Sequence, residues 1–201
     1  MKTLKNLLIL LITVSATAST ALAHDMNMAS SKKGLFGLKP EYLHVLSNPL
    51  PTHGLVIGIA MLAFGLLRRN QSLKIAGLVV TAICAASAWP VLYFGQHGYN
   101  NLAPMLDDES HQWLDEHMRR AEQFIYFFYG TAVLAVAALA CPKKFPKACT
   151  SLVVLTLALG VVSLGIGGWI ARAGGQISHS EFRTGQEPEN APAPQHSNTN
   201  N

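Results

Sequence analysis

Charged side chains are scarce in this chain. Only 13% of its 201 residues are charged and half are hydrophobic, whereas about 25% of residues in a typical soluble domain are charged. This composition predicts a protein whose main solvent is lipid. The lysines and arginines form no basic patch interleaved with aromatic residues, so nucleic acid is not an expected partner.

Cysteine is also rare, with three in the whole chain. Cys84 lies inside an apolar run and is expected to pack as a small hydrophobic side chain. Cys141 and Cys149 flank a lysine-rich loop that we place in the reducing cytoplasm, so no structural disulfide is expected. No CxxC pattern occurs, and a cysteine zinc site or a covalent c-type haem therefore has no support.

Recognisable catalytic motifs are missing as well. The sequence has no nucleophile elbow, no phosphate-binding glycine loop, no dinucleotide fingerprint and no HExxH. The apolar runs contain no carboxylate except Glu122, at the rim of the third run, which argues against a proton relay across the membrane. These absences favour a binding protein over an enzyme.

The first feature that is present is a signal peptide over residues 1–23. Lys2 and Lys5 give it a positive start, an apolar stretch follows, and Ala21-Leu22-Ala23 matches a small-residue cleavage site. An uncleaved amphipathic anchor is the alternative interpretation. The mature chain would begin with an extracytoplasmic segment over residues 24–49.

Residues 50–183 contain four apolar runs and are expected to form the membrane domain, followed by a disordered tail over 184–201 that is rich in proline, asparagine and glutamine. Each run approaches the length of about 20 residues that crosses a bilayer as a helix. The fold class predicted is all-α, a four-transmembrane-helix bundle. The four runs are Leu50–Leu67, Leu73–Phe94, Phe124–Ala140 and Thr150–Ala173.

Three further local features are expected around these runs. Residues 41–48 are predicted to form a short interfacial helix that Pro49 and Pro51 stop. Trp89-Pro90 is predicted to bend the second span and widen a cavity there. Residues 107–120 are predicted to form a polar helical extension of the third span.

The distribution of charge predicts the orientation. The link between the first two spans and the link between the last two carry only basic charges, from Arg68 to Lys74 and from Lys143 to Lys147. The long link between them is acidic, from Asp107 to Glu116. The positive-inside rule places the two basic links in the cytoplasm. Both mature termini are then extracytoplasmic, in a multi-pass protein of the bacterial inner membrane.

Histidines are the strongest candidates for a functional site. On this topology all four spans deliver a histidine toward the extracytoplasmic end, and imidazole is a common ligand of transition metals and haem iron. Interfacial histidines with structural hydrogen bonds are the competing interpretation. The cofactor candidates are His53, His97, His117 and His179 with Arg120 and Arg172, and the metal candidates are His44, His117 and His179.

Two other clusters bear on binding. Glu116 and Arg120 are four residues apart and can pair on one helix face, as can Arg119 and Glu122. The cluster would hold His117 or bind a haem propionate, or it would simply anchor the helix at the interface. At the mature terminus, His24, Met26 and Met28 offer soft ligands suited to Cu(I).

Three stretches carry a resemblance to a known group. His44 to Pro51, Asp115 to Glu122 and Gly174 to Arg183 resemble small bacterial four-span membrane proteins, a group similar to a broader membrane domain of unknown function. The resemblance covers roughly residues 41–183 and implies that His44, His117 and His179 are positions of interest. Other members often have histidine at the place of Pro49.

These observations lead to two hypotheses. The first is a membrane module that binds haem b or a transition-metal ion through extracytoplasmic histidines and passes electrons. The second is a non-enzymatic accessory or scaffold subunit that packs against a larger membrane complex or against a second copy of itself. Small residues on the helix faces, such as Gly58 and Gly160, allow close helix packing in lipid, and together with the disordered outer tail they favour the second hypothesis.

Overall fold

The described part of the chain consists of four long helices with short turns between and after them. The computed structural model describes residues 37–142 and 144–183, and within these ranges every regular element is helical. Each of the four helices is long and apolar enough to span a membrane. The expectation of an all-α bundle typical of a multi-pass membrane protein is therefore confirmed. The predictions for the signal peptide, for His24, Met26 and Met28, and for the tail lie outside the described residues.

The first long helix contains an unusual turn. It consists of α2 (Pro40–Ser47), a π-helical turn η2 (Leu50–Gly54) and α3 (Leu55–Leu67). The predicted short helix over residues 41–48 is present as α2, which ends just before Pro49, but the prolines do not end the helical path, because the chain continues through the π-helical turn. The Thr52 hydroxyl donates to the Asn48 carbonyl at 3.1 Å, a local hydrogen bond of the kind that satisfies backbone freed by proline in membrane helices.

The second long helix is interrupted at the expected place. It runs through α4 (Gln71–Ala86) and α5 (Ala88–Leu102) and ends in the short turn η3 (Ala103–Met105). The break at Ser87 lies three residues before Pro90, which has no N–H to bond the carbonyl of Ala86. The Ser87 hydroxyl donates to the Cys84 carbonyl at 2.6 Å and satisfies backbone beside the break.

The third and fourth helices are uninterrupted. α6 (Asp108–Ala140) and α7 (Pro146–Ser178) each contain 33 residues, and a short turn η4 (Ser180–Phe182) follows. α6 begins with the expected polar extension, where the Asp107 side chain accepts from the backbone N–H of Ser110 at 2.8 Å. This capping bond satisfies a donor at the helix start that would otherwise lack a partner.

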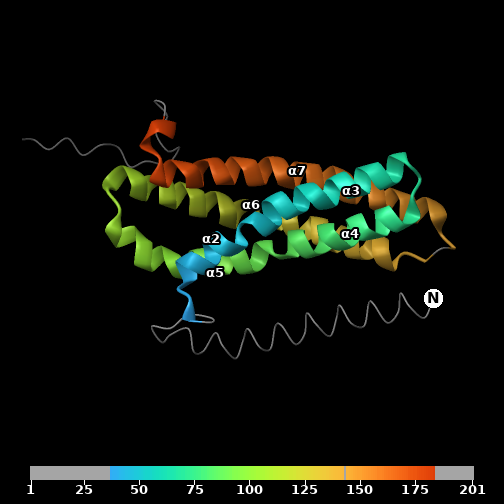
Figure 1. The fold of residues 1–201 in the computed structure, drawn as a ribbon, viewed down its shortest axis with the longest axis horizontal. Coiled ribbons are helices and arrows are strands. Elements are labelled where there is room, and N and C mark those ends of the chain that lie inside the picture. Colours follow the sequence, from blue (N-terminus) through green and yellow to red (C-terminus); the bar gives the residue numbers. More distant parts are fainter. Residues whose placement is uncertain (1–36, 143, 184–201) are drawn as a thin grey trace, which may run out of the picture.

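The helices pack in a ring in which α3 contacts α4, α4 contacts α6, α6 contacts α7 and α7 contacts α3, while α2 packs on α5 (Figure 1). Glycines allow close approach, since a Cβ on Gly77 would lie 2.6 Å from the backbone nitrogen of Leu62. A hydrogen bond of 2.9 Å joins Thr131 and Ser163 between α6 and α7. Large apolar side chains such as Phe64, Val133 and Leu155 are exposed on the outer surface, as lipid contact requires.

A disulfide joins Cys141 to Cys149 across the loop between α6 and α7. The expectation that these cysteines form no disulfide is wrong. The loop returns the chain from α6 to the adjacent α7, and this turn brings the two Cα atoms within 5.5 Å, inside the range that a disulfide spans. Cys84 is free and buried, as expected.

Candidate functional site

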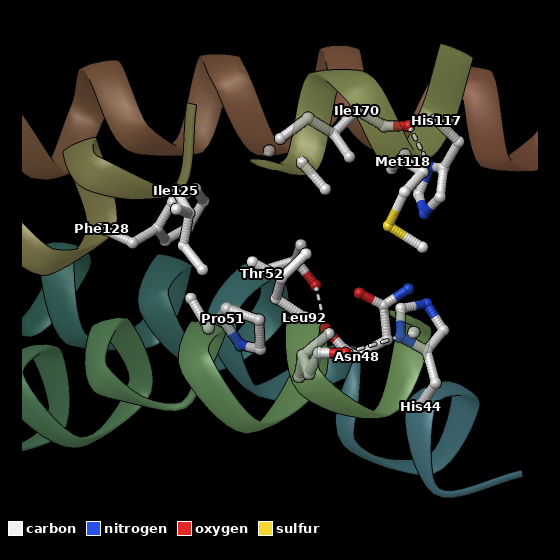
Figure 2. Close-up of a pocket in the computed structure, with 16 residues that line it drawn as sticks. His44, Asn48, Pro51, Thr52, Leu92, His117, Met118, Ile125, Phe128 and Ile170 are labelled. Carbon is white, nitrogen blue, oxygen red and sulfur yellow. Dashed lines mark hydrogen bonds between the residues drawn. The ribbon is translucent and has the colours of Figure 1, made fainter. Parts of the chain in front are cut away.

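Two of the candidate histidines meet inside the bundle. His44 comes from α2 and His117 from α6, and their ring centres lie 6.1 Å apart with the ring planes nearly perpendicular, at 86°. The two residues are 73 positions apart in the sequence, so only the fold brings them together. Figure 2 shows the two rings on opposite sides of one cavity, pointing toward each other.

Each ring lies against a glycine of a neighbouring helix. A Cβ added to Gly95 on α5 would lie 3.0 Å from Nδ1 of His44, and one added to Gly174 on α7 would lie 3.1 Å from Nδ1 of His117. Gly98, one turn beyond Gly95, lets α5 approach the backbone of Glu41. These glycines provide the space in which the two imidazoles pack.

Main-chain carbonyls fix the tautomer of both imidazoles. Nδ1 of His44 lies 2.8 Å from the Val91 carbonyl, and Nδ1 of His117 lies 2.9 Å from the Ile170 carbonyl. A carbonyl oxygen only accepts, so each ring donates from Nδ1 and, when neutral, keeps a lone pair on Nε2. Both Nε2 atoms are therefore prepared to bind an electrophile such as a metal ion.

The cavity between the rings is small and mostly apolar, with a volume of about 70 Å³. Met118 and Asn48 also line it, and Figure 2 shows the Met118 thioether pointing into the space beside the two rings. Its remaining walls come from apolar side chains and glycines of α5, α6 and α7 and from the π-helical turn, including Pro51, Leu92, Ile125 and Phe128.

The other three histidine candidates lie elsewhere. His53 is exposed and contacts the Thr52 hydroxyl at 3.1 Å. His97 is exposed, bonds the Tyr93 carbonyl at 2.8 Å and lies against the Tyr93 ring in a tilted arrangement. His179 pairs with Glu181 at 3.0 Å on the surface beyond α7. None of these three lines the cavity between His44 and His117.

Arg120 belongs to a buried charge cluster one turn from His117. The Glu116 side chain is only 2% exposed and accepts from Arg120 at 2.6 Å and from Arg119 at 2.8 Å. Arg120 also donates to the Trp169 carbonyl and lies over the Trp169 ring. These contacts tie α6 to α7 just beside the histidine pair. The pairing predicted between Glu116 and Arg120 is confirmed.

Arg172, the second arginine candidate, is exposed on α7. It does not line the cavity between the histidines.

Sequence reasoning missed two residues of this site, Met118 and Asn48. Asn48 lies four positions after His44 and Met118 directly follows His117, so helical spacing could have placed Asn48 on the face of His44. Nothing in the sequence places Met118 toward the cavity, because its orientation depends on how α6 packs. His111 was also passed over, and it contacts the Tyr99 hydroxyl at 3.1 Å.

Within residues 37–142 and 144–183, no group of three or more histidine, cysteine, aspartate or glutamate side chains is placed to hold a metal ion. A metal between His44 and His117 would therefore have two imidazole ligands and the thioether of Met118 as the third neighbouring donor. Two imidazoles and a thioether form a set of nitrogen and soft sulfur ligands, which suits copper and haem iron better than calcium or magnesium.

Comparisons of the chain with protein-family models, with curated proteins and with solved structures give no match. The resemblance to small four-span bacterial membrane proteins therefore stays a prediction.

Proposed function

We propose that this protein is a membrane redox protein that holds one transition-metal centre between His44 and His117 and passes electrons through it. The observation that carries the proposal is the pair of facing imidazoles, each with Nδ1 fixed by a main-chain carbonyl. Metal-bound histidines commonly donate their second nitrogen in this way, which orients the ring and raises its basicity.

The separation of the rings suits a single metal centre. Two metal–nitrogen bonds of about 2 Å each span about 4 Å. The rest of the 6.1 Å between ring centres is the sum of two short distances, each from a ring centre to the nitrogen of that ring that would bind the metal. One metal can therefore bind both imidazoles from opposite sides with little movement of α2 or α6.

Two kinds of centre meet this chemistry, a copper ion and the iron of haem b. Both accept two imidazoles. The cavity volume of about 70 Å³ favours the ion, because sites for larger ligands are about 300–1,000 Å³. The small residues along the wall, among them Ala88, Ala121 and Gly167, favour haem, because they would let a flat macrocycle lie close to the backbone.

The charge distribution supports an orientation for the molecule. The α3–α4 turn and the α6–α7 loop lie at one end of the bundle and carry basic but no acidic residues, whereas the acidic residues gather toward the opposite end (Figure 1). By the positive-inside rule the basic end is cytoplasmic. The histidine pair then lies toward the extracytoplasmic side of a bacterial inner membrane, where it would exchange electrons with exported partners.

The test is a metal analysis and an absorption spectrum of the full chain purified in mild detergent, as isolated and after loading with Cu(I) or haem. A Soret band identifies haem, and bound copper without that band identifies the ion. His44→Ala and His117→Ala should each abolish binding. His97→Ala is the matched control, because His97 also bonds a main-chain carbonyl through Nδ1 but has no facing histidine.

Wild-type protein that binds neither copper nor haem would overturn the proposal. The scaffold hypothesis would then be preferred if the same histidine variants lost a co-purifying membrane protein.

A further inference from the structure

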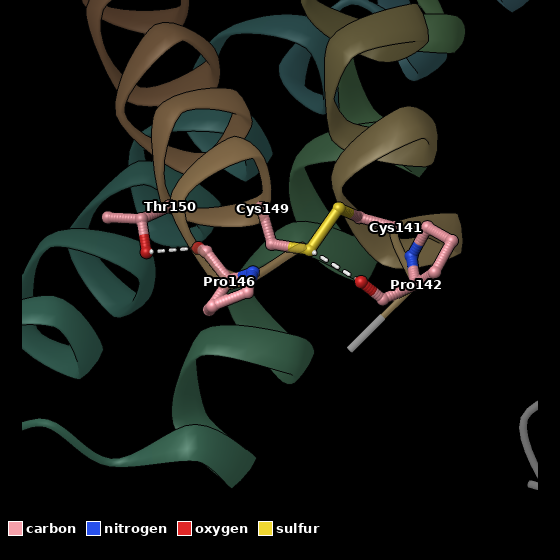
Figure 3. Close-up of a disulfide and its surroundings, with 5 residues drawn as sticks. All are labelled: Cys141, Pro142, Pro146, Cys149 and Thr150. Atoms are coloured by element: carbon pink, nitrogen blue, oxygen red, sulfur yellow. Dashed lines mark hydrogen bonds between the residues drawn. A yellow bond between two sulfur atoms is a disulfide. The ribbon is translucent and has the colours of Figure 1, made fainter. Parts of the chain in front are cut away.

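The disulfide lies at the end of the bundle opposite the histidine pair. Figure 3 shows Cys141 at the end of α6 bonded to Cys149 in the first turn of α7. The loop between them carries Lys144 and Lys147, so it is cytoplasmic in the orientation proposed above. Disulfides are rare in that compartment, and those that occur there are usually transient and either catalytic or redox-sensing. The position of the bond therefore indicates a reactive pair.

A second cavity adjoins this disulfide. It has a volume of about 460 Å³ and is bordered by both cysteines, which places it within the usual size range of small-molecule sites, about 300–1,000 Å³. Its walls are mainly apolar and come from all four long helices, with Leu66, Leu78, Leu139 and Val153 among them. A ligand of this cavity would therefore be largely apolar.

Three polar side chains also line the cavity, Gln71 and Lys74 at the start of α4 and Thr150 in α7. The acidic residues among the described ranges belong to α2, to the stretch from Asp107 to Glu122 and to η4, all toward the other end of the molecule (Figure 1). No described carboxylate is therefore available to neutralise the ammonium of Lys74, and it can donate to a ligand carbonyl.

We infer that Cys141 and Cys149 form a redox-active pair and that the adjoining cavity binds a membrane quinone. A quinone is apolar, dissolves in the bilayer, accepts two electrons and presents carbonyl oxygens to donors. These properties match the apolar walls, the pair of sulfur atoms and the donors that Gln71 and Lys74 contribute to the lining. This site is separate from the histidine pair and does not need a metal.

The proposed reaction is an exchange of two electrons and two protons. The thiols of Cys141 and Cys149 lose their protons, the S–S bond forms, and the two electrons released reduce the quinone. Both quinone oxygens take up a proton, so the products are the disulfide and one hydroquinone. Lys74 would stabilise the negative charge that develops on one quinone oxygen, and a cytoplasmic reductant of the thiol class would return the pair to the dithiol.

The experiment mixes reduced full-length protein with a short-chain ubiquinone analogue in detergent without oxygen. Thiols are counted by maleimide labelling and hydroquinone by its ultraviolet absorbance. We expect two thiols lost and one hydroquinone formed for each protein. Cys149→Ser should abolish the reaction, whereas Cys84→Ser should leave it unchanged because Cys84 is buried elsewhere in the bundle. Lys74→Gln should slow it about tenfold, the low end of what a hydrogen bond to a charged group contributes.

Thiols that oxidise no faster with the quinone than without it would overturn the inference, and so would equal rates in the wild type and Lys74→Gln. Metal binding does not enter this assay, so its failure is distinguishable from failure of the histidine site. Maleimide labelling of membranes from either side separately tests the orientation, and a pair that can be labelled only from outside would identify the bond as a structural link.

Discussion

At the scale of single residues, the histidine pair is positioned by backbone rather than by other side chains. A carbonyl bonds Nδ1 of each ring, and a glycine of a neighbouring helix lies against the ring. Such a site changes little when distant side chains change. It is sensitive instead to any atom added at the two glycines.

Gly174→Ala tests this sensitivity. The new methyl group would lie 3.1 Å from two atoms of the His117 ring, so the ring must move by a few tenths of an ångström relative to the Ile170 carbonyl that it bonds. We expect metal affinity to fall about 10–100-fold, as for loss of other groups that orient a ligand, while the protein still folds. Gly165→Ala on the same helix is the control, because nothing lies within 4 Å of its Cβ position. Equal affinities in the two variants would contradict this account.

Glu116→Gln tests the buried charge cluster. The substitution leaves two guanidinium groups beside an uncharged side chain that is 2% exposed in the native protein. Breaking a buried ion pair typically costs about 3 kcal/mol, and we expect a loss of that size in the free energy of unfolding in detergent. The exposed Glu122, changed to glutamine, should alter it by about 0.5 kcal/mol or less. If the two variants lose the same stability, the buried charge cluster around Glu116 does not hold α6 and α7 together.

At the scale of elements, apolar content predicted the four helices but not their full extent. The second helix extends to Met105, well past the expected end at Phe94, whereas α6 begins at Asp108, in agreement with the polar extension predicted over residues 107–120. These extensions are polar, so a hydropathy window cannot detect them. They are helical because they pack on each other, and they contain His97 and His117.

Asp107, which caps α6, gives this element a pH dependence. The backbone N–H and the hydroxyl of Ser110 both donate to its carboxylate, and these bonds hold the pKa of Asp107 below its ordinary value of 3.8. Because the folded-state pKa is the lower one, the stabilisation is complete above the ordinary pKa and is lost as the pH falls through the folded value.

The thermal unfolding temperature of wild-type protein should therefore fall between about pH 6 and pH 3 by more than that of Asp107→Asn, which retains a capping oxygen without the charge. Asp108→Asn removes the neighbouring carboxylate and leaves the cap intact, so it should follow the wild type. If the unfolding temperature of Asp107→Asn falls as much as that of the wild type, the Asp107 carboxylate is not the source of the pH dependence.

At the scale of the whole molecule, the site was only partly predictable. The sequence indicated that histidines gather toward one end, and His44 and His117 were among the candidates. It could not show that these two would face each other, because that depends on how α2 packs on α5 and α6 packs on α7. The disulfide was missed for a different reason, since the compartment assigned to the loop argued against the bond, whereas chain geometry permits it.

Orientation is a property of the whole chain, and reporter fusions measure it. An alkaline phosphatase joined after Arg183 should be active, because that end is proposed to be extracytoplasmic, and one joined after Lys144 should be inactive. The positive-inside rule is the physical basis of this expectation. The reverse pattern of activity would move the histidine pair to the cytoplasmic face.

The π-helical turn between α2 and α3 bears on how related chains should be compared. A π-helical turn contains one residue more than an α-helical turn, so the residues on either side of it follow different helical phases, offset by about 100°. A relative with an uninterrupted α-helix here would have its counterpart of His44 one position nearer to its counterpart of Leu55. An alignment of such a relative needs a single gap within Leu50–Gly54, or it will match the histidine with a residue on the wrong side of the helix.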